Sequence, residues 1–189
     1  MGEKTLNKKN MPMIVRAIPL EGHRLNIEFA SGSALLLCMQ NRLHTTRYYA
    51  LNEPQVFYSA ASDGWKISFS KKPIVEKVEK LEVEIFAREA VHMALHPPEG
   101  QKPILNAQPL PQHEVWLELA GGSTLLLNLK NRLYRDPYTV LQDKALLRAV
   151  TTDGENLYFN DALQIDLDEL ENLLLTDPPH GKAGEEREE

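Results

Sequence analysis

The sequence predicts an α+β fold made of two similar units, each a small antiparallel sheet with one helix, duplicated about a pseudo-twofold axis. The main observation is an internal repeat, because residues 14–70 align with residues 104–160 without a gap. Both copies also contain short segments in which apolar and polar residues alternate, separated by glycine-containing turns. Alternation at period two is typical of half-buried strands, so each copy is predicted to form a sheet.

The repeat is well above the level of chance. Of the 57 aligned positions 20 are identical, whereas unrelated sequences of this composition would share about three or four. The longest identical blocks are Leu35–Leu37 with Leu125–Leu127 and Asn41–Leu43 with Asn131–Leu133. Because insertions accumulate in loops, the absence of gaps predicts that the turns occupy the same positions in both copies.

Local patterns predict the same order of elements in each copy. Alternating or continuously apolar segments indicate strands, Ser-Gly and Asp-Gly pairs indicate hairpin turns, and the longer segment between them suits a short helix. The elements of the first copy are strands at Ile14–Ile18, Leu25–Phe29, Ala34–Met39 and Trp65–Ser70, turns at Ser31–Ser33 and Asp63-Gly64, and a helix within Thr46–Ala60. The second copy repeats them 90 residues later, with its helix within Asp136–Val150.

The leucine runs Leu35–Leu37 and Leu125–Leu127 predict central strands. The first and third leucine of each run are expected to face the core. Continuously apolar strands are typical of sheets that are covered on both faces. The middle leucines, Leu36 and Leu126, are therefore expected to lie under another element.

Outside the repeat, residues 75–101 are predicted to form a linking helix and loop. Val75, Val78, Leu81 and Ile85 recur at roughly helical spacing. A strand at Leu81–Phe86 is the alternative, because that segment also alternates. The second copy is expected to end in a short helix at Ile165–Leu175. The predicted organisation is a disordered N-terminus (1–11), repeat one (12–74), the link (75–101), repeat two (102–175) and a disordered acidic tail (176–189).

Composition narrows the function classes. The net charge of −6 and an isoelectric point near 5.6 make a nucleic-acid partner unlikely, because neutralising phosphates requires a basic surface. Cys38 is the single cysteine, which excludes an intrachain disulfide and a thiolate metal cluster. Its counterpart in the second copy is Asn128, which argues against a catalytic thiol. No apolar segment approaches the roughly 20 residues that span a bilayer, and no signal-peptide pattern is present. A cytoplasmic protein without a membrane partner is expected.

The turn and core residues resemble those of a bacterial family of small domains with no established activity, about 80 residues long. The residues that carry the resemblance are Phe29–Gly32, Asp63–Phe69 and Asp153–Phe159. The resemblance implies a tandem duplication of that domain. Some members of the family are found beside a helix-turn-helix domain, whereas this chain has a second copy instead.

Two residue types that recur in both copies are candidate ligand or partner residues. Arg42 and Arg132 follow an apolar strand, and a guanidinium group offers fixed bidentate geometry to an anion. The alternative is that each arginine pairs with a carboxylate of its own unit, such as Glu28. Tyr48 and Tyr138 are the other candidates, as part of a stacking platform, although aromatic residues at this spacing are more often part of a core.

The remaining repeated polar residues have simpler interpretations. His23 and His113 could share a metal or an anion, but neither has a second ligand nearby in sequence, so polar loop residues are expected. Asp63 and Asp153 precede glycine, and turn formation explains them better than acid–base catalysis. No phosphate-binding loop, nucleophile motif or metal-ligand cluster is found, and no cofactor is expected.

The sequence therefore predicts a non-enzymatic cytoplasmic interaction or regulatory module with a protein partner, existing as a pseudo-dimeric monomer or a homodimer. The alternative is a small-molecule or anion-binding protein. Its pocket would lie between the two repeats, lined by Arg42, Arg132 and the tyrosines Tyr48 and Tyr138. An enzyme ranks third, because a duplicated catalytic group would be found in both copies.

Overall fold

The computed structural model describes residues 13–70, 82–98 and 100–176. The predicted disordered ends, apart from Thr176, and residues 75–81 and 99 of the predicted link lie outside this part of the chain. The first half has strands β1 (Ile14–Leu20), β2 (Arg24–Phe29), β3 (Ala34–Cys38), β4 (Ala61–Ser62), β5 (Lys66–Ser70) and β6 (Glu82–Phe86), helices α1 (Pro54–Phe57) and α2 (Ala87–Leu95), and 3-10 turns η1 (Gln40–Arg42) and η2 (Tyr49–Asn52).

The second half has the same elements in the same order, with one additional 3-10 turn. They are strands β7 (Ile104–Leu110), β8 (Glu114–Leu119), β9 (Thr124–Asn128), β10 (Val150–Thr152), β11 (Leu157–Phe159) and β12 (Leu163–Ile165), helices α3 (Lys144–Arg148) and α4 (Leu167–Leu175), and 3-10 turns η3 (Ala120–Gly122), η4 (Lys130–Arg132) and η5 (Tyr138–Gln142).

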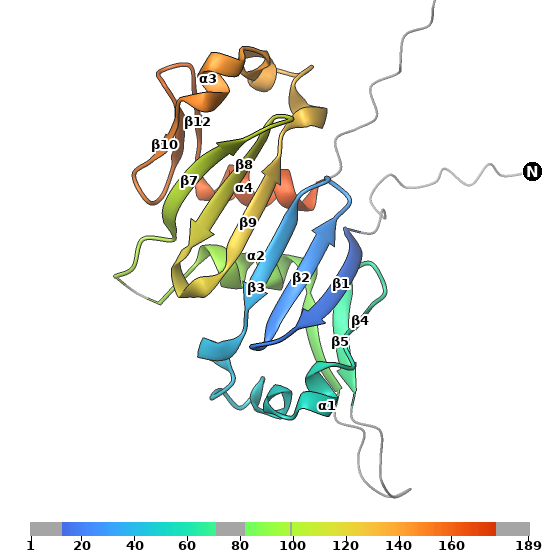
Figure 1. The fold of residues 1–189 in the computed structure, drawn as a ribbon. Coiled ribbons are helices and arrows are strands. Elements are labelled where there is room, and N and C mark those ends of the chain that lie inside the picture. Colours follow the sequence, from blue (N-terminus) through green and yellow to red (C-terminus); the bar gives the residue numbers. More distant parts are fainter. Residues whose placement is uncertain (1–12, 71–81, 99, 177–189) are drawn as a thin grey trace, which may run out of the picture.

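The strands form an α+β fold around one central sheet (Figure 1). This antiparallel sheet has six strands in the order β1-β2-β3-β9-β8-β7, so both halves contribute three strands to it. Each half also has a separate three-stranded sheet, β4-β5-β6 or β10-β11-β12. The expectation of one small sheet per unit is therefore corrected. The sequence identifies the alternating segments as strands, but it does not show which of them join the shared sheet and which form a separate one.

One face of the central sheet holds the core. The inward side chains of β2, β3, β8 and β9 are at most 3% exposed, and they are Leu25, Ile27, Phe29, Leu35, Leu37, Val115, Leu117, Leu119, Leu125 and Leu127. Helices α2 and α4 contact each other and lie behind this face in Figure 1. The outer leucines of both runs thus face the core, as the sequence predicts.

The two halves are joined by β3 and β9, which pair over only three residues. Leu35 lies opposite Leu125 at the centre, with Ala34 opposite Leu126 and Leu36 opposite Thr124. Beyond each end of this ladder a serine hydroxyl accepts a backbone hydrogen bond. Ser33 Oγ accepts from Asn128 N, and Ser123 Oγ accepts from Cys38 N, both at 3.0 Å. Both serines are buried, so they extend the pairing of two otherwise short strands.

The predicted linking helix is wrong for residues 82–86, where the structure has strand β6 (Figure 1). Val83 and Ile85 are buried and Glu84 is not, which is the period-two pattern of the alternative interpretation. β6 pairs along the full length of β5, and this pairing overrides the helical spacing. The helix begins only at Ala87, with Ala90, Val91 and Ala94 buried on one side.

The predicted helices within 46–60 and 136–150 are each divided into a 3-10 turn and a short α-helix. In the first half Glu53 is extended, because Pro54 disfavours helical backbone at the residue before it. In the second half Asp143 takes the extended conformation and its side chain accepts from Ala145 N. Tyr48, Leu51 and Phe57 are buried, as predicted. The predicted terminal helix at 165–175 begins at Leu167, because Ile165 belongs to β12.

The Asp-Gly turns lie at matching positions, between β4 and β5 and between β10 and β11. Gly64 and Gly154 have φ of 96° and 99°, a conformation that glycine adopts without steric cost. Asp63 Oδ1 accepts from the backbone N–H of Trp65 and Lys66, and these bonds lower the pKa of the carboxyl. Asp153 makes the same two bonds, with the same effect on its pKa. Turn formation therefore explains both aspartates.

Candidate functional site

The candidate tyrosines Tyr48 and Tyr138 lie in the core, at 7% and 6% exposure. Each hydroxyl donates a hydrogen bond to a glutamate in the first turn of the helix of its own half, Glu89 in α2 and Glu169 in α4. Burial and the bond to Glu89 raise the pKa of Tyr48 to about 12. The same causes raise the pKa of Tyr138. Each tyrosine thus fastens a 3-10 turn to a helix.

We expect Tyr48→Phe to lower the free energy of unfolding by about 1–2 kcal/mol, because a hydrogen bond to a charged group is lost. Tyr48 has a higher pKa in the folded chain than in the unfolded one, so its contribution is present below the usual tyrosine pKa and is lost as pH rises toward 12. Urea unfolding at neutral and alkaline pH measures both effects. Tyr58→Phe is the control, since Tyr58 is 52% exposed. Equal effects of the two variants would contradict this role.

The candidate arginines Arg42 and Arg132 bind the last turns of these helices. Arg42 donates to the carbonyl of Met93 at 2.8 Å, and Arg132 donates to the carbonyl of Thr176 at 2.5 Å. A cation at a helix C-terminus is favourable, because the carbonyl groups there carry partial negative charge. The expected alternative partner Glu28 is instead bound by Arg16, at 2.6 Å.

Sequence reasoning missed Glu89 and Glu169 because the repeat changes its offset. Residues 14–70 match at an offset of 90, whereas Ile85, Glu89 and Leu95 match Ile165, Glu169 and Leu175 at an offset of 80. The difference falls in the connection between β5 and β6, which has 11 residues, whereas that between β11 and β12 has 3. A search that allowed one gap would have found the helices as a further part of the match.

The repeated histidines do not converge on a site. His23 and His113 lie in the turns that connect β1 to β2 and β7 to β8, and both have positive φ. The His23 ring packs edge-on against Phe57, with 5.1 Å between the ring centres. Within residues 13–70, 82–98 and 100–176, no group of three or more His, Cys, Asp or Glu side chains is placed to hold a metal ion.

A pocket of about 230 Å³ lies where the two halves meet, and we name it the junction pocket. The first half contributes the end of β3, the η1 turn and the segment after α2, and the second half contributes the β8–β9 turn. The lining residues are Cys38, Asn41, Arg42, Met93, His96, Pro97, Pro98, Ala120, Gly121 and Ser123. Of the four candidate residues only Arg42 lines it, and Arg132, Tyr48 and Tyr138 do not.

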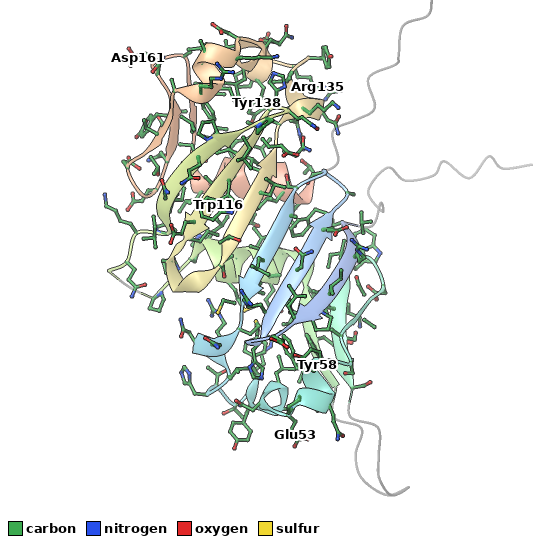
Figure 2. All side chains as sticks on the ribbon, in the orientation of Figure 1. Glu53, Tyr58, Trp116, Arg135, Tyr138 and Asp161 are labelled. Atoms are coloured by element: carbon green, nitrogen blue, oxygen red, sulfur yellow. The ribbon has the colours of Figure 1, made fainter. Side chains whose placement is uncertain are left out.

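The second feature is the uncovered face of the central sheet, which we name the open face. Its half-buried apolar centre is Ile18, Ala34, Leu36, Trp116 and Leu126, and its charged residues are Arg16, Arg24, Glu28, Glu114 and Glu118. Figure 1 looks onto this face, and none of the described helices crosses it. Trp116 stands on the half formed by β7, β8 and β9 (Figure 2).

Leu36 and Leu126 are therefore not covered within the described part of the chain, contrary to the prediction. Both are partly buried by their neighbours on the sheet alone. The leucine runs have the composition of strands covered on two faces, but the helices of the described part of the chain cover only one face. This mismatch between sequence pattern and cover is the clearest functional signal in the fold.

Comparison of the chain with family models, with curated proteins and with solved structures finds no match. The resemblance to the bacterial family of small domains therefore stays a prediction. No helix among the described residues is long and apolar enough to cross a membrane.

Proposed function

We propose that the chain is a non-enzymatic, cytoplasmic interaction module, formed by internal duplication, that binds through the open face of its central sheet. We further propose that a second copy of the chain occupies this face. The observation that carries the proposal is the pair of half-buried leucines, Leu36 and Leu126, at the centre of a sheet face that no helix of residues 13–70, 82–98 and 100–176 covers.

The register of the central sheet supports the duplication and its pseudo-twofold axis. Leu35 pairs with Leu125, its own counterpart in the repeat, and the flanking pairs are Ala34 with Leu126 and Leu36 with Thr124. A twofold axis normal to the sheet between Leu35 and Leu125 would relate these pairs to each other. The reciprocal bonds from Ser33 and Ser123 follow the same relation. This arrangement resembles a dimer whose interface has been fused into one chain.

The apolar content of the open face supports the proposal that a protein partner, and not solvent, covers it. Four apolar or aromatic side chains lie together on the neighbouring strands β3, β9 and β8, and they are Ala34, Leu36, Leu126 and Trp116. Asn26 separates Ile18 from Leu36, and Thr124 lies on the other side of Leu36. Interfaces commonly have an apolar centre with aromatic residues and a polar rim. Two sheets that pack face to face bury such side chains in a layer about 10 Å thick.

The charges of the open face favour a second copy as the partner. The first half carries Arg16, Arg24 and Glu28, and Arg16 already pairs with Glu28, which leaves Arg24 as excess positive charge. The second half carries Glu114 and Glu118 with no basic residue among its outward positions. An antiparallel pair of copies would place each positive half over a negative half. Such an interface is isologous and closes at two protomers.

We expect the purified chain to sediment with a mass near twice 21.5 kDa at micromolar concentration. Leu126→Lys should convert it to the monomer, because an unpaired ammonium group at the centre of an apolar interface is strongly unfavourable. Sedimentation equilibrium measures both states. Circular dichroism spectra should show an unchanged fold, since the replaced side chain lies on the outer face.

Leu105→Lys is the matched control, because Leu105 is a leucine of β7 that is 58% exposed and lies outside the apolar centre of the open face. This variant should remain a dimer. A wild-type chain that stays monomeric to about 100 µM, well above typical specific dissociation constants, would show that the occupant is not a second copy. A dimer that survives Leu126→Lys would show that the open face is not the interface.

A further inference from the structure

The junction pocket is assembled from three backbone segments that come together only because the halves share a sheet. Asn41 and Arg42 belong to η1, His96 follows the end of α2, and Gly121 and Ser123 belong to the turn before β9. Gly121 has φ of 82°, and a Cβ atom there would lie 3.8 Å from the Asn41 amide nitrogen. This glycine thus brings the second-half turn close to the first-half side chain.

The charge of the junction pocket favours an anion. Its lining residues include the guanidinium group of Arg42 and no carboxylate. Arg42 donates one bond, to the carbonyl of Met93 at 2.8 Å, and a guanidinium group has five N–H donors. The amide of Asn41 supplies further hydrogen-bonding capacity on the same side, and Asn41 is exposed.

A buried backbone donor at the junction pocket supports the same conclusion. In the first half the N–H of Ser33 is bonded to Ser31 Oγ, at 3.3 Å. In the second half glycine replaces that serine at position 121, so the N–H of Ser123 lacks this side-chain acceptor. Ser123 is only 3% exposed, and buried backbone N–H groups are almost always paired.

We propose that the junction pocket binds a small oxyanion, either a carboxylate or a phosphate, between Arg42, Asn41 and the backbone N–H of Ser123. The guanidinium group supplies the charge, and the Ser123 amide, which lacks the side-chain acceptor that Ser31 gives Ser33, supplies a hydrogen bond to the ligand. The volume of about 230 Å³ is below the range of drug-sized sites, roughly 300–1,000 Å³, which indicates a small ligand. This site is independent of the apolar centre of the open face.

Titration of the full-length chain with inorganic phosphate, and separately with succinate, tests the proposal by following backbone amide signals in NMR spectra. The Ser123 amide should shift downfield with at least one of the two anions, while the Ser33 amide stays in place as an internal control. Chloride at equal ionic strength should have no such effect. The anion that binds more tightly identifies the source of the oxyanion group.

Arg42→Gln should weaken binding by about tenfold or more, because the charge-assisted bonds are lost. Arg132→Gln is the matched control, since it also removes a bond to a helix end but lies away from the junction pocket. If Arg42→Gln does not fold, Asn41→Ala with Asn131→Ala as control replaces the pair. A Ser123 amide unmoved by both anions at about 10 mM, a weak affinity for a small ligand, or equal effects of the two arginine variants, would overturn the site. Sedimentation of the same samples tests the open face separately.

Discussion

Replacing Leu125 with alanine is expected to lower the free energy of unfolding by about 2–5 kcal/mol, the usual cost of a leucine-to-alanine change in a core. Leu125 is 1% exposed and lies opposite Leu35 at the centre of the six-stranded sheet. Its loss leaves a cavity between the sheet and the helices α2 and α4, which are packed together there. Urea unfolding followed by circular dichroism measures the change.

Leu126→Ala is the control for this variant, because it removes the same atoms from the next residue of the same strand. Leu126 lies on the open face and is only partly buried, so the monomer should lose less than about 1 kcal/mol. Both variants should be measured below the concentration at which the chain associates. Equal losses would mean that the two faces of β9 are covered to the same extent, which the fold contradicts.

Replacing Ser33 and Ser123 together with alanine is expected to cost about 1–2 kcal/mol for each serine, because each change leaves a partly buried backbone N–H without its acceptor. The affected donors are Asn128 N and Cys38 N, at the two ends of the short β3–β9 ladder. Within the central sheet the halves are joined through three residue pairs, so the loss falls on this short ladder. Chemical denaturation of the double variant measures the sum.

Ser62→Ala is the control for the serine variants. Its hydroxyl also accepts a backbone bond, from Gly64 N at 3.1 Å, but Ser62 is exposed and water can replace the bond. It should cost less than about 1 kcal/mol. A double variant as stable as Ser62→Ala would show that the serines do not hold the halves together.

Much of the secondary structure could be predicted because alternation and turn chemistry are local properties. The strands at Leu25–Phe29 and Trp65–Ser70, and the turns with Gly64 and Gly154, follow from residues a few positions apart. The helix prediction for residues 82–86 failed because pairing with β5 makes these residues a strand. β5 lies too far away in the sequence to influence the local pattern from which helical spacing is read. The shared sheet could not be predicted either, since no local pattern specifies that β3 pairs with β9.

The candidate site was predicted only in part, and the reason lies in what an internal repeat preserves. Identity between the copies selected Arg42, Arg132, Tyr48 and Tyr138, and in the structure these side chains fasten each helix to its own half. The junction pocket instead depends on a difference between the copies, Ser31 against Gly121. Contacts between the halves decide where that difference matters, and these are not visible in the alignment.

The outer strands of the central sheet limit how the protein can associate. β1 and β7 form the two edges of this sheet, and a free strand edge can add further strands from other chains without limit. Each edge is occupied at its start, where Ile14 N and Ile104 N donate to the carbonyls of Gly64 and Gly154. Each contains a register irregularity near its start and a proline near its end, Pro19 or Pro109, which offers no N–H for pairing. Growth into filaments by strand addition is thereby discouraged at both edges. Association through the open face stops at two protomers, and the sheet does not discourage it.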